Sequence, residues 1–550
     1  MVAAIIARLV VLTNYQINWD EFFFLSKVHQ FLHNDLAKVM QSFHVHFFTW
    51  LPFISENEAD QIIVARGVMA CLQFATAVCL FRISKRFLSN PAAWFVVLSY
   101  FSFSNVIRHG ASFRADPIAT FLLIASIDLT LNSTMVASSI LAGILIGLAG
   151  IITIKSALYV PTIGSLLLVL IIFSDNRRVV FTKSLVMISS ALAAFVLFYL
   201  YHKSSLAVEP IQQAVASIDH GYNKTINFTQ IFPKVGYFRS SLKSDFVYWI
   251  AIGFGLFITA KSIKDTTFMD RATALIIIAM VFPLITILFY RNAYPYYYTF
   301  IMASTSILCG VAWDAMPWQK QPNIAKLFVV FSLFSIVVRI ITYGYILPYT
   351  KNLNHQKNIL SVIHKVFPEP VPYIDRCSMV SSYPKVGMFM STWGLENYRE
   401  ANMPILSQTI TKEQPKFLVV NINQLDPLLT SEQRQNTIHP DYDLLQEDIA
   451  VLRDNYIQHW GKLFVPGKKL QLNKDEISYF NILIEGIYTV ESSIAVIINN
   501  NEVMPGETIF LNRGVNVLTT SYAGNLYLRW GDHLYMPNMP AYKYSLFNGF

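Results

Sequence analysis

Residues 135–173 read MVASSILAGILIGLAGIITIKSALYVPTIGSLLLVLIIF, and Lys155 is the only charged residue among them. The apolar segments on either side of it, 135–153 and 156–173, each approach the ~20 residues that an α-helix needs to cross a bilayer. Backbone polar groups must be paired within hydrocarbon, so such segments are predicted to be helices. Nine further segments share this character: 1–17, 62–81, 91–107, 116–131, 182–201, 245–261, 272–290, 294–313 and 324–347. The predicted fold class is a polytopic α-helical membrane protein with eleven spans.

The apolar segments end near residue 350, and the rest of the chain has the composition of a soluble protein. Over the whole chain only 14% of residues are charged, whereas soluble domains carry about 25%. We predict a membrane domain over 1–350 and a mixed α/β region over 351–470, with buried strands at 377–380 and 417–420. Residues 471–550 contain short apolar strands separated by turns, a pattern typical of a β-sandwich.

Basic residues are unevenly distributed among the connecting loops. One alternating set of loops holds eleven Lys and Arg residues and few acids, so the positive-inside rule places this set in the cytoplasm. The long loops 18–61 and 202–244 and the C-terminal region are then extracytoplasmic. We expect an integral protein of a bacterial inner or plasma membrane, in contact with membrane lipids. The net charge of +8 forms no basic stripe, so nucleic acid is not predicted as a partner.

Ionisable residues gather at the predicted external ends of the helices, where they are functional candidates by default. The acids are Asp20, Glu21 and Asp116, and the cations are Arg108, Arg114, Lys155 and Arg291. A carboxylate can take a proton from an acceptor hydroxyl or amine. Fixed cations can hold a phosphate or diphosphate as it leaves. With the boundary aromatics Tyr294 and Tyr297, this set predicts glycosyl transfer from a polyprenyl-phosphate donor.

Five short motifs occur in a fixed order along the membrane domain. They are Asp20-Glu21 in the first external loop, His44-Val45-His46-Phe47-Phe48 later in that loop, Arg114-Ala115-Asp116, Thr153-Ile154-Lys155-Ser156, and the segment from Arg291 to Tyr298. In this order the chain resembles the membrane glycosyltransferases with the GT-C fold. The most similar group contains the protein O-mannosyltransferases and the lipid A aminoarabinose transferases.

The resemblance covers about residues 1–350 and implies an inverting transfer from a polyprenyl-phosphate sugar. It implies that the first acidic residue is the base and that the basic residues grip the phosphate. Some members of the group hold a divalent metal ion near the motif that His44 and His46 occupy here. This chain lacks the prolines of that motif. The expected acceptor is a glycan, a lipid or a protein.

Each candidate residue also has a structural interpretation. Asp20 and Glu21 suit the first turn of an interfacial helix, and Asp116 precedes Pro117 as a helix cap does. The cations can extend to lipid headgroups, and the tyrosines can form an aromatic belt. Two other functions use such a scaffold, a membrane transporter and a non-catalytic protein for glycan assembly or binding. Transporters usually carry polar groups at mid-membrane, whereas the charges here are predicted at one face.

Overall fold

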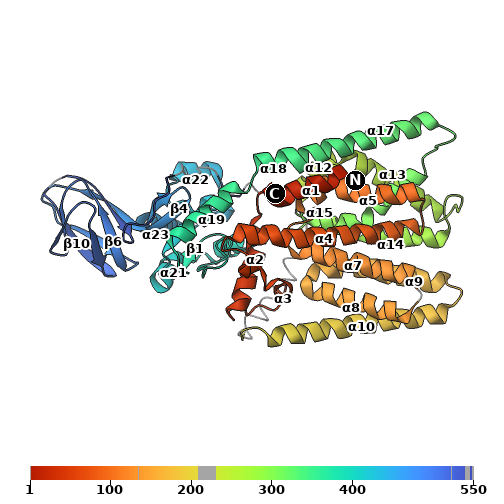
Figure 1. Ribbon diagram of the computed structural model, residues 1–550, viewed down its shortest axis with the longest axis horizontal. Helices are drawn as coiled ribbons and strands as arrows, with labels where there is room; N and C mark the ends of the chain where they lie inside the picture. Colours follow the sequence, from red (N-terminus) through yellow and green to blue (C-terminus); the bar gives the residue numbers. More distant parts are fainter. Residues whose placement is uncertain (1, 134, 209–230, 522, 539–544, 548–550) are drawn as a thin grey trace.

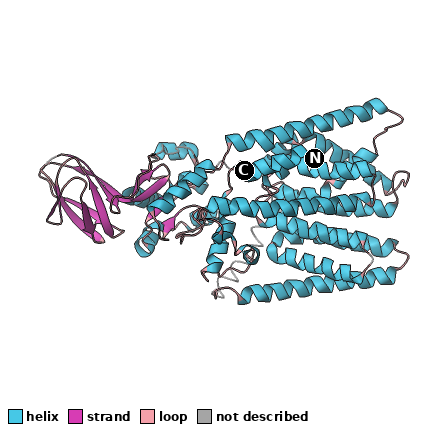
Figure 2. Ribbon diagram, in the orientation of Figure 1, coloured by secondary structure: helices cyan, strands magenta, loops and turns pink. Residues whose placement is uncertain are grey.

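The computed structural model covers residues 1–550 and describes all of them except 1, 134, 209–230, 522, 539–544 and 548–550. A bundle of long helices forms one end of the molecule, and a domain that contains the strands forms the other (Figure 1; Figure 2). This division agrees with the predicted fold class of a helical membrane domain followed by a region with β-strands.

Within the described residues, six helices are long and apolar enough to cross a membrane. They are Glu58–Lys85 (α4), Ala115–Asn132 (α7), Ile154–Phe173 (ending in α9, Val160–Phe173), Arg177–Ser204 (α10), Arg271–Leu288 (beginning with α14, Arg271–Ile285) and Pro322–Thr350 (beginning with α17, Pro322–Arg339). A seventh span is made if α12 (Val235–Ser244) and α13 (Phe246–Ser262) are counted together, although they meet at 97°. The shorter apolar helices α1 (Val2–Asn14) and α8 (Val136–Ile152) complete this set. The total of eleven spans stays a prediction.

Two predicted spans are broken into pairs of helices. Residues 91–107 form α5 (Asn90–Ser102) and α6 (Ser104–His109), and residues 294–313 form α15 (Tyr297–Thr305) and α16 (Ile307–Asp314). Asp245 explains the first break, since its carboxylate accepts hydrogen bonds from the backbone N–H and the hydroxyl of Ser104, at 2.8 and 2.5 Å. Asp245 itself lies at the bend between α12 and α13, so one buried carboxylate holds two broken helices together.

The C-terminal domain, residues 354–550, is called the external domain after its predicted location. It begins with α19 (Asn354–Val366) and contains two β-sheets. A first sheet joins β1 (Tyr373–Ile374) in parallel to β2 (Phe417–Val419), which pairs antiparallel with the long strand β4 (Leu463–Leu472). Residues 377–380 form a loop rather than the predicted strand. The helices around this sheet are α20 (Thr392–Ala401), α21 (Leu406–Glu413), α22 (Ser431–Thr437) and α23 (Gln446–Asn455).

The β-sandwich is formed by antiparallel strands that follow β4. One layer continues the first sheet through β4, in the order β4, β11 (Gly524–Trp530), β6 (Gly486–Glu491) and β9 (Thr508–Leu511), and β3 (Tyr456–Trp460) also pairs with β4. The second sheet has the order β5 (Ser478–Ile482), β10 (Gly514–Thr519), β7 (Val496–Ile498) and β8 (Asn501–Val503). Apolar side chains such as Phe480, Val490 and Leu528 alternate into the space between the sheets and form its core.

The external domain is fastened to the start of α4 by polar contacts. The Lys357 ammonium donates to Asp60 at 2.6 Å, and His364 Nε2 lies 3.0 Å from the buried carboxylate of Glu58. Glu58 also accepts a hydrogen bond of 2.6 Å from the hydroxyl of Ser382. These contacts fix the external domain over the end of the bundle at which α2 lies (Figure 1).

Candidate functional site

Helix α2 (Trp19–Leu32) carries the two acids of the first external loop. Asn18 caps it, because its side chain accepts from the backbone N–H of Asp20 at 3.0 Å and its own N–H donates to the Glu21 carboxylate at 3.0 Å. This reciprocal capping box fixes where the helix begins. Asp20 and Glu21 are neighbours in a helix, so their side chains point in different directions and meet different surroundings.

Glu21 forms a buried ion pair with Arg66 of α4. The guanidinium donates twice to the carboxylate, with Nε to Oε2 at 2.8 Å and Nη2 to Oε1 at 2.7 Å. The backbone N–H of Phe113 adds a third hydrogen bond at 2.8 Å. Burial alone would raise the pKa of Glu21, but Arg66 and these hydrogen bonds hold that pKa below its usual value. Glu21 therefore joins α2, α4 and the loop before α7 as a buried ion pair.

Asp20 begins a chain of alternating charges. Its Oδ2 accepts from Arg114 Nη1, and Arg114 Nε lies 3.4 Å from Asp116. The Lys155 ammonium donates to the other oxygen of Asp116 at 2.6 Å. Both cations lie over the ring of Tyr296, at 3.5 and 4.7 Å from its centre. The structure thus brings Asp20, Arg114, Asp116 and Lys155 together, with their formal charges balanced.

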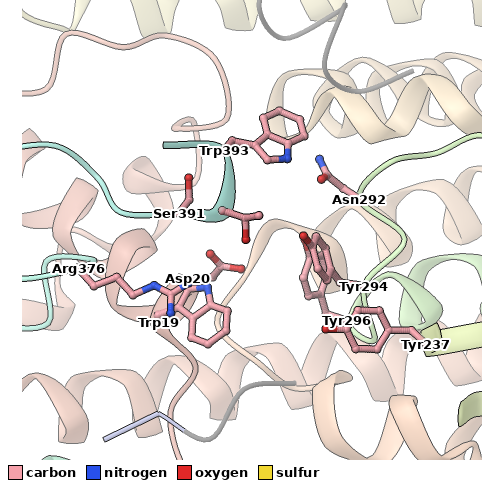
Figure 3. Close-up of a pocket in the computed structure, with 10 residues that line it drawn as sticks. Trp19, Asp20, Tyr237, Asn292, Tyr294, Tyr296, Arg376, Ser391 and Trp393 are labelled. Atoms are coloured by element: carbon pink, nitrogen blue, oxygen red, sulfur yellow. The ribbon is translucent and has the colours of Figure 1, made fainter. Parts of the chain in front are cut away.

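Asp20 also lines a cavity of about 260 Å³ between the bundle and the external domain (Figure 3). Its Oδ1 makes no hydrogen bond to any residue that the structure describes. Five aromatic side chains form much of the wall: Trp19, Tyr237, Tyr294, Tyr296 and Trp393. The external domain supplies Arg376, Ser391, Thr392 and Trp393, and the loop before α15 supplies Asn292. Aromatic faces beside hydroxyl and amide groups suit a carbohydrate ring.

The segment that follows α14 contributes unequally to this cavity. Tyr294 lines it, whereas Tyr297 is fully buried and its hydroxyl lies 2.6 Å from that of Thr286. Arg291 lies beyond the cavity wall, where it pairs with Glu396 of α20 at 3.1 Å and stacks over Trp393. Arg291 is therefore held by the external domain and not by the Asp20 cluster.

Arg108 lines a second cavity, of about 420 Å³, along α6 and α12. Lys234 lies on the same wall, and Tyr237 borders both cavities. Among the described residues that line this second cavity, none is acidic. Arg108 donates to Asn105, but its Nε is buried without a hydrogen-bond partner in the described part of the chain. The described lining thus holds two cations and no carboxylate, which makes this cavity suited to an anion.

His44 and His46 do not converge on a shared point. His44 Nε2 bonds the backbone oxygen of Phe24 at 3.1 Å, and burial lowers the pKa of His44 to about 3. His46 Nε2 instead lies 2.9 Å from Nδ1 of His202. Across the described residues, no group of three or more His, Cys, Asp or Glu side chains is arranged to hold a metal ion. The two histidines therefore do not fit the metal site that the resemblance implied.

Several residues of the two cavities were not among the sequence candidates. They are Trp19, Lys234, Tyr237, Asn292, Tyr296, Arg376, Ser391, Thr392 and Trp393. A signal existed for Trp19 and Tyr296, since both adjoin candidate residues in the sequence. No local signal marks Arg376 or Trp393, because they reach the site only when the external domain folds over the bundle.

No protein-family model and no curated protein matches this chain. Among solved structures, the archaeal oligosaccharyltransferase AglB from Archaeoglobus fulgidus, in complex with an inhibitory peptide and a dolichol-phosphate, is similar over 98% of this chain and 97% of its own, with a TM-score of 0.53 and 11% identity. The apo form of the Archaeoglobus fulgidus enzyme matches 94% of this chain and 76% of its own, at 0.51 and 12%. ArnT from Cupriavidus metallidurans, bound to undecaprenyl phosphate, matches 70% of this chain and 84% of its own, at 0.49 and 15%. This chain is thus an integral membrane protein with the GT-C fold that the archaeal oligosaccharyltransferase structures share.

Proposed function

We propose that this protein is a glycosyltransferase that moves a sugar from a polyprenyl-phosphate donor to an extracytoplasmic acceptor, which is a glycan, a lipid or a protein. The observation that carries the proposal is the position of Asp20. This carboxylate is fixed by Arg114 on one oxygen and faces an aromatic cavity with the other, at the end of a helical membrane bundle. The dolichol-phosphate in the AglB complex adds support, because that structure has the same fold.

In this proposal Asp20 is the general base. Its free oxygen takes the proton of the acceptor hydroxyl or amine as the acceptor atom forms a bond to C1 of the sugar. The bond from C1 to the phosphate oxygen breaks on the opposite face, so the configuration at C1 inverts. The electron pair leaves on the lipid-linked phosphate. None of these steps is assigned to a metal ion, because His44 and His46 have separate partners.

The second cavity is the place we assign to the donor phosphate. Arg108 and Lys234 supply two positive charges there, and no acid among the described lining residues neutralises them. Arg114 and Lys155 are less suited to the phosphate, because Asp20 and Asp116 already pair with them. Tyr237 separates this cavity from the one that Asp20 lines. A sugar on the phosphate would reach past Tyr237 toward Asp20.

We assign Glu21 and Asp116 positioning roles. Glu21 holds the start of α2 through Arg66, and Asp116 holds Arg114 and Lys155 in line behind Asp20. Neither acid is among the described residues that line the aromatic cavity. Their removal should disturb the placement of Asp20 without removing the base itself.

The test is a transfer assay in native membranes. Full-length protein is supplied with radiolabelled polyprenyl-phosphate sugars, and wild type is compared with Asp20→Asn and Asp128→Asn. Asp128 is a matched control because it also pairs with a cation, Arg82 at 3.0 Å, near the far end of α7. We expect transfer by wild type and Asp128→Asn but not by Asp20→Asn. Equal transfer by all three would refute the role of Asp20, and the absence of transfer from every donor would refute the proposed function.

A further inference from the structure

Arg376 is held at the aromatic cavity by a tightly organised loop of the external domain. The Asp375 carboxylate is buried and accepts backbone N–H groups from Cys377, Ser378 and Met379, at 3.0, 2.8 and 2.7 Å. The Asn421 amide donates to Asp375 at 3.0 Å and accepts the N–H of Arg376 at 3.0 Å. These bonds fix the backbone on both sides of Arg376, so the side chain leaves the loop in a defined direction.

The Arg376 guanidinium stacks on Trp19, 3.9 Å from the ring centre, beside Asp20 (Figure 3). Within the described part of the chain it makes no ion pair, and its buried Nε has no hydrogen-bond partner. Burial lowers the pKa of Arg376, which reflects the cost of holding a charge away from water. An arginine stays charged nonetheless. The stack covers the face of the guanidinium and leaves its N–H groups at the edge for a ligand.

Three other cations near the aromatic cavity are paired with acids. Arg114 pairs with Asp20, Lys155 pairs with Asp116, and Arg291 pairs with Glu396. Arg376 differs from these three cations because it makes no ion pair with a described residue, although its backbone is equally well fixed. Arg376 is partly buried, and the Asp20 and Asp375 carboxylates lie close enough to act on its charge. Its planar guanidinium is well suited to bind a carboxylate or phosphate through two N–H groups.

We propose that Arg376 binds a negatively charged group, a carboxylate or a phosphate, on a carbohydrate acceptor held in the aromatic cavity. This inference rests on the proposed function and names the acceptor class for the same site. Trp19, Trp393 and Tyr294 line the cavity with aromatic rings for the sugar, and Ser391 and Asn292 line it with polar groups for its hydroxyls. The acceptor charge would then lie against the external domain while its reacting hydroxyl faces Asp20.

The donor phosphate is a less suitable ligand for Arg376. The lipid of the donor lies in the membrane, whereas Arg376 belongs to the external domain and its loop rests on the sheet of β1 and β2. Arg108 and Lys234 lie on helix α6 and just before α12, beside the bundle. The two sets of cations therefore serve two anions, and variants of each set should separate them.

The test is a binding measurement on the full-length protein in nanodiscs and does not depend on turnover. The probes are methyl glucuronide, glucose 6-phosphate and the neutral methyl glucoside. We expect one or both anionic probes to bind about 10- to 100-fold more tightly than the neutral one, as a charge-assisted bidentate contact provides. The comparison of glucuronide with the phosphate tells which anion the site takes.

Three variants complete the design. Arg376→Gln should remove the preference for the anionic probe, and Arg376→Lys should keep part of it, since it retains the charge but not the planar fork. Lys416→Gln is the matched control, because Lys416 is a second cation of the external domain that lies over a tryptophan ring, 5.2 Å from the centre of Trp530. It should bind as wild type does. Thermal unfolding of each variant identifies any that fails to fold, and Arg376→Lys then carries the comparison.

Equal binding of charged and neutral probes by wild type would overturn the inference, as would a preference that survives in Arg376→Gln. If Arg376→Gln instead weakens the binding of undecaprenyl phosphate, Arg376 belongs to the donor and the inference is wrong. These outcomes are separate from the fate of the proposed function, which the transfer assay with Asp20→Asn decides.

Discussion

Asp20→Asn and Glu21→Gln change neighbouring carboxylates, and we expect the two variants to lose different properties. Both substitutions remove one negative charge and keep the shape of the side chain. The two carboxylates differ in what surrounds them. Asp20 is 21% exposed and faces a cavity, whereas Glu21 is 1% exposed and is enclosed by Arg66 and backbone N–H groups. The structure therefore predicts a loss of activity for one variant and a loss of stability for the other.

The cost of Glu21→Gln follows from the charge it leaves behind. Arg66 is 4% exposed, and without Glu21 its remaining partners are the backbone oxygens of Leu12, Tyr15 and Gln16. Breaking a buried ion pair by removing one partner costs about 3–5 kcal/mol. We expect the thermal unfolding midpoint of Glu21→Gln to fall by several degrees.

Asp20→Asn leaves a milder defect in the fold. Arg114 keeps Asp116 and the ring of Tyr296 as partners, so the unfolding free energy should fall by only about 1–2 kcal/mol. The transfer rate should fall about 100- to 10,000-fold, the contribution of a positioned general base. The assay pairs thermal unfolding, followed by tryptophan fluorescence, with transfer from the donor. The reasoning is refuted if Glu21→Gln abolishes transfer at an unchanged midpoint, or if Asp20→Asn transfers as wild type does.

Three further predictions test the surroundings of the site. Arg108→Gln should raise the KM for the donor about 10- to 100-fold with little change in the midpoint, since it removes one cation from the proposed phosphate cavity; an unchanged KM would place the phosphate elsewhere. A double-mutant cycle of Arg291→Gln and Glu396→Gln should give a coupling of about 0.5–1 kcal/mol, because both side chains are partly exposed; a null coupling would mean that this pair does not fasten the external domain. Glu58 raises the pKa of His364 against the opposing effect of burial. The contribution of the His364–Glu58 pair to stability is therefore complete below the ordinary histidine pKa and is lost as pH rises through the raised value. The resulting fall in the unfolding midpoint with rising pH should disappear in His364→Gln, and its persistence there would contradict the assignment.

Much of the membrane architecture could be predicted because hydropathy is a local property of the chain. The apolar run that contains α8 and α9 needs no partner to be identified, and helix ends on one side of a bilayer must meet at one face. This explains why Asp20, Arg114, Asp116 and Lys155 could be grouped from their positions alone. The break at α5–α6 involves a distant side chain, Asp245, which hydropathy does not register.

The details of the site depended on contacts between distant segments. The run of four tyrosines around Pro295 does not reveal which ring faces the cavity, since that is set by where α15 begins; Tyr296 lies under Arg114, while Tyr297 is buried in the core. The apolar residues after Arg376 suggested a strand, but the Asp375 carboxylate binds their N–H groups and turns them into a loop. Burial of Arg66 against Glu21 was equally hidden, because it joins two helices across the bundle.

In the proposed function, the balance of charges around Asp20 gives the external domain a part in the site. In the cluster of Asp20, Arg114, Asp116 and Lys155, two acids and two cations cancel, so the cluster can hold the base in place but offers little attraction to an incoming anion. Attraction must come from cations outside it. In the described chain these are Arg108 with Lys234 on the bundle side and Arg376 on the external side, with Tyr237 reaching the cavities of both. A base between two separate cationic sites suits a reaction between two anionic substrates. Each substrate is attracted to a different site, so the like charges of the two substrates stay apart. The external domain would then contribute to substrate selection as well as covering the membrane bundle.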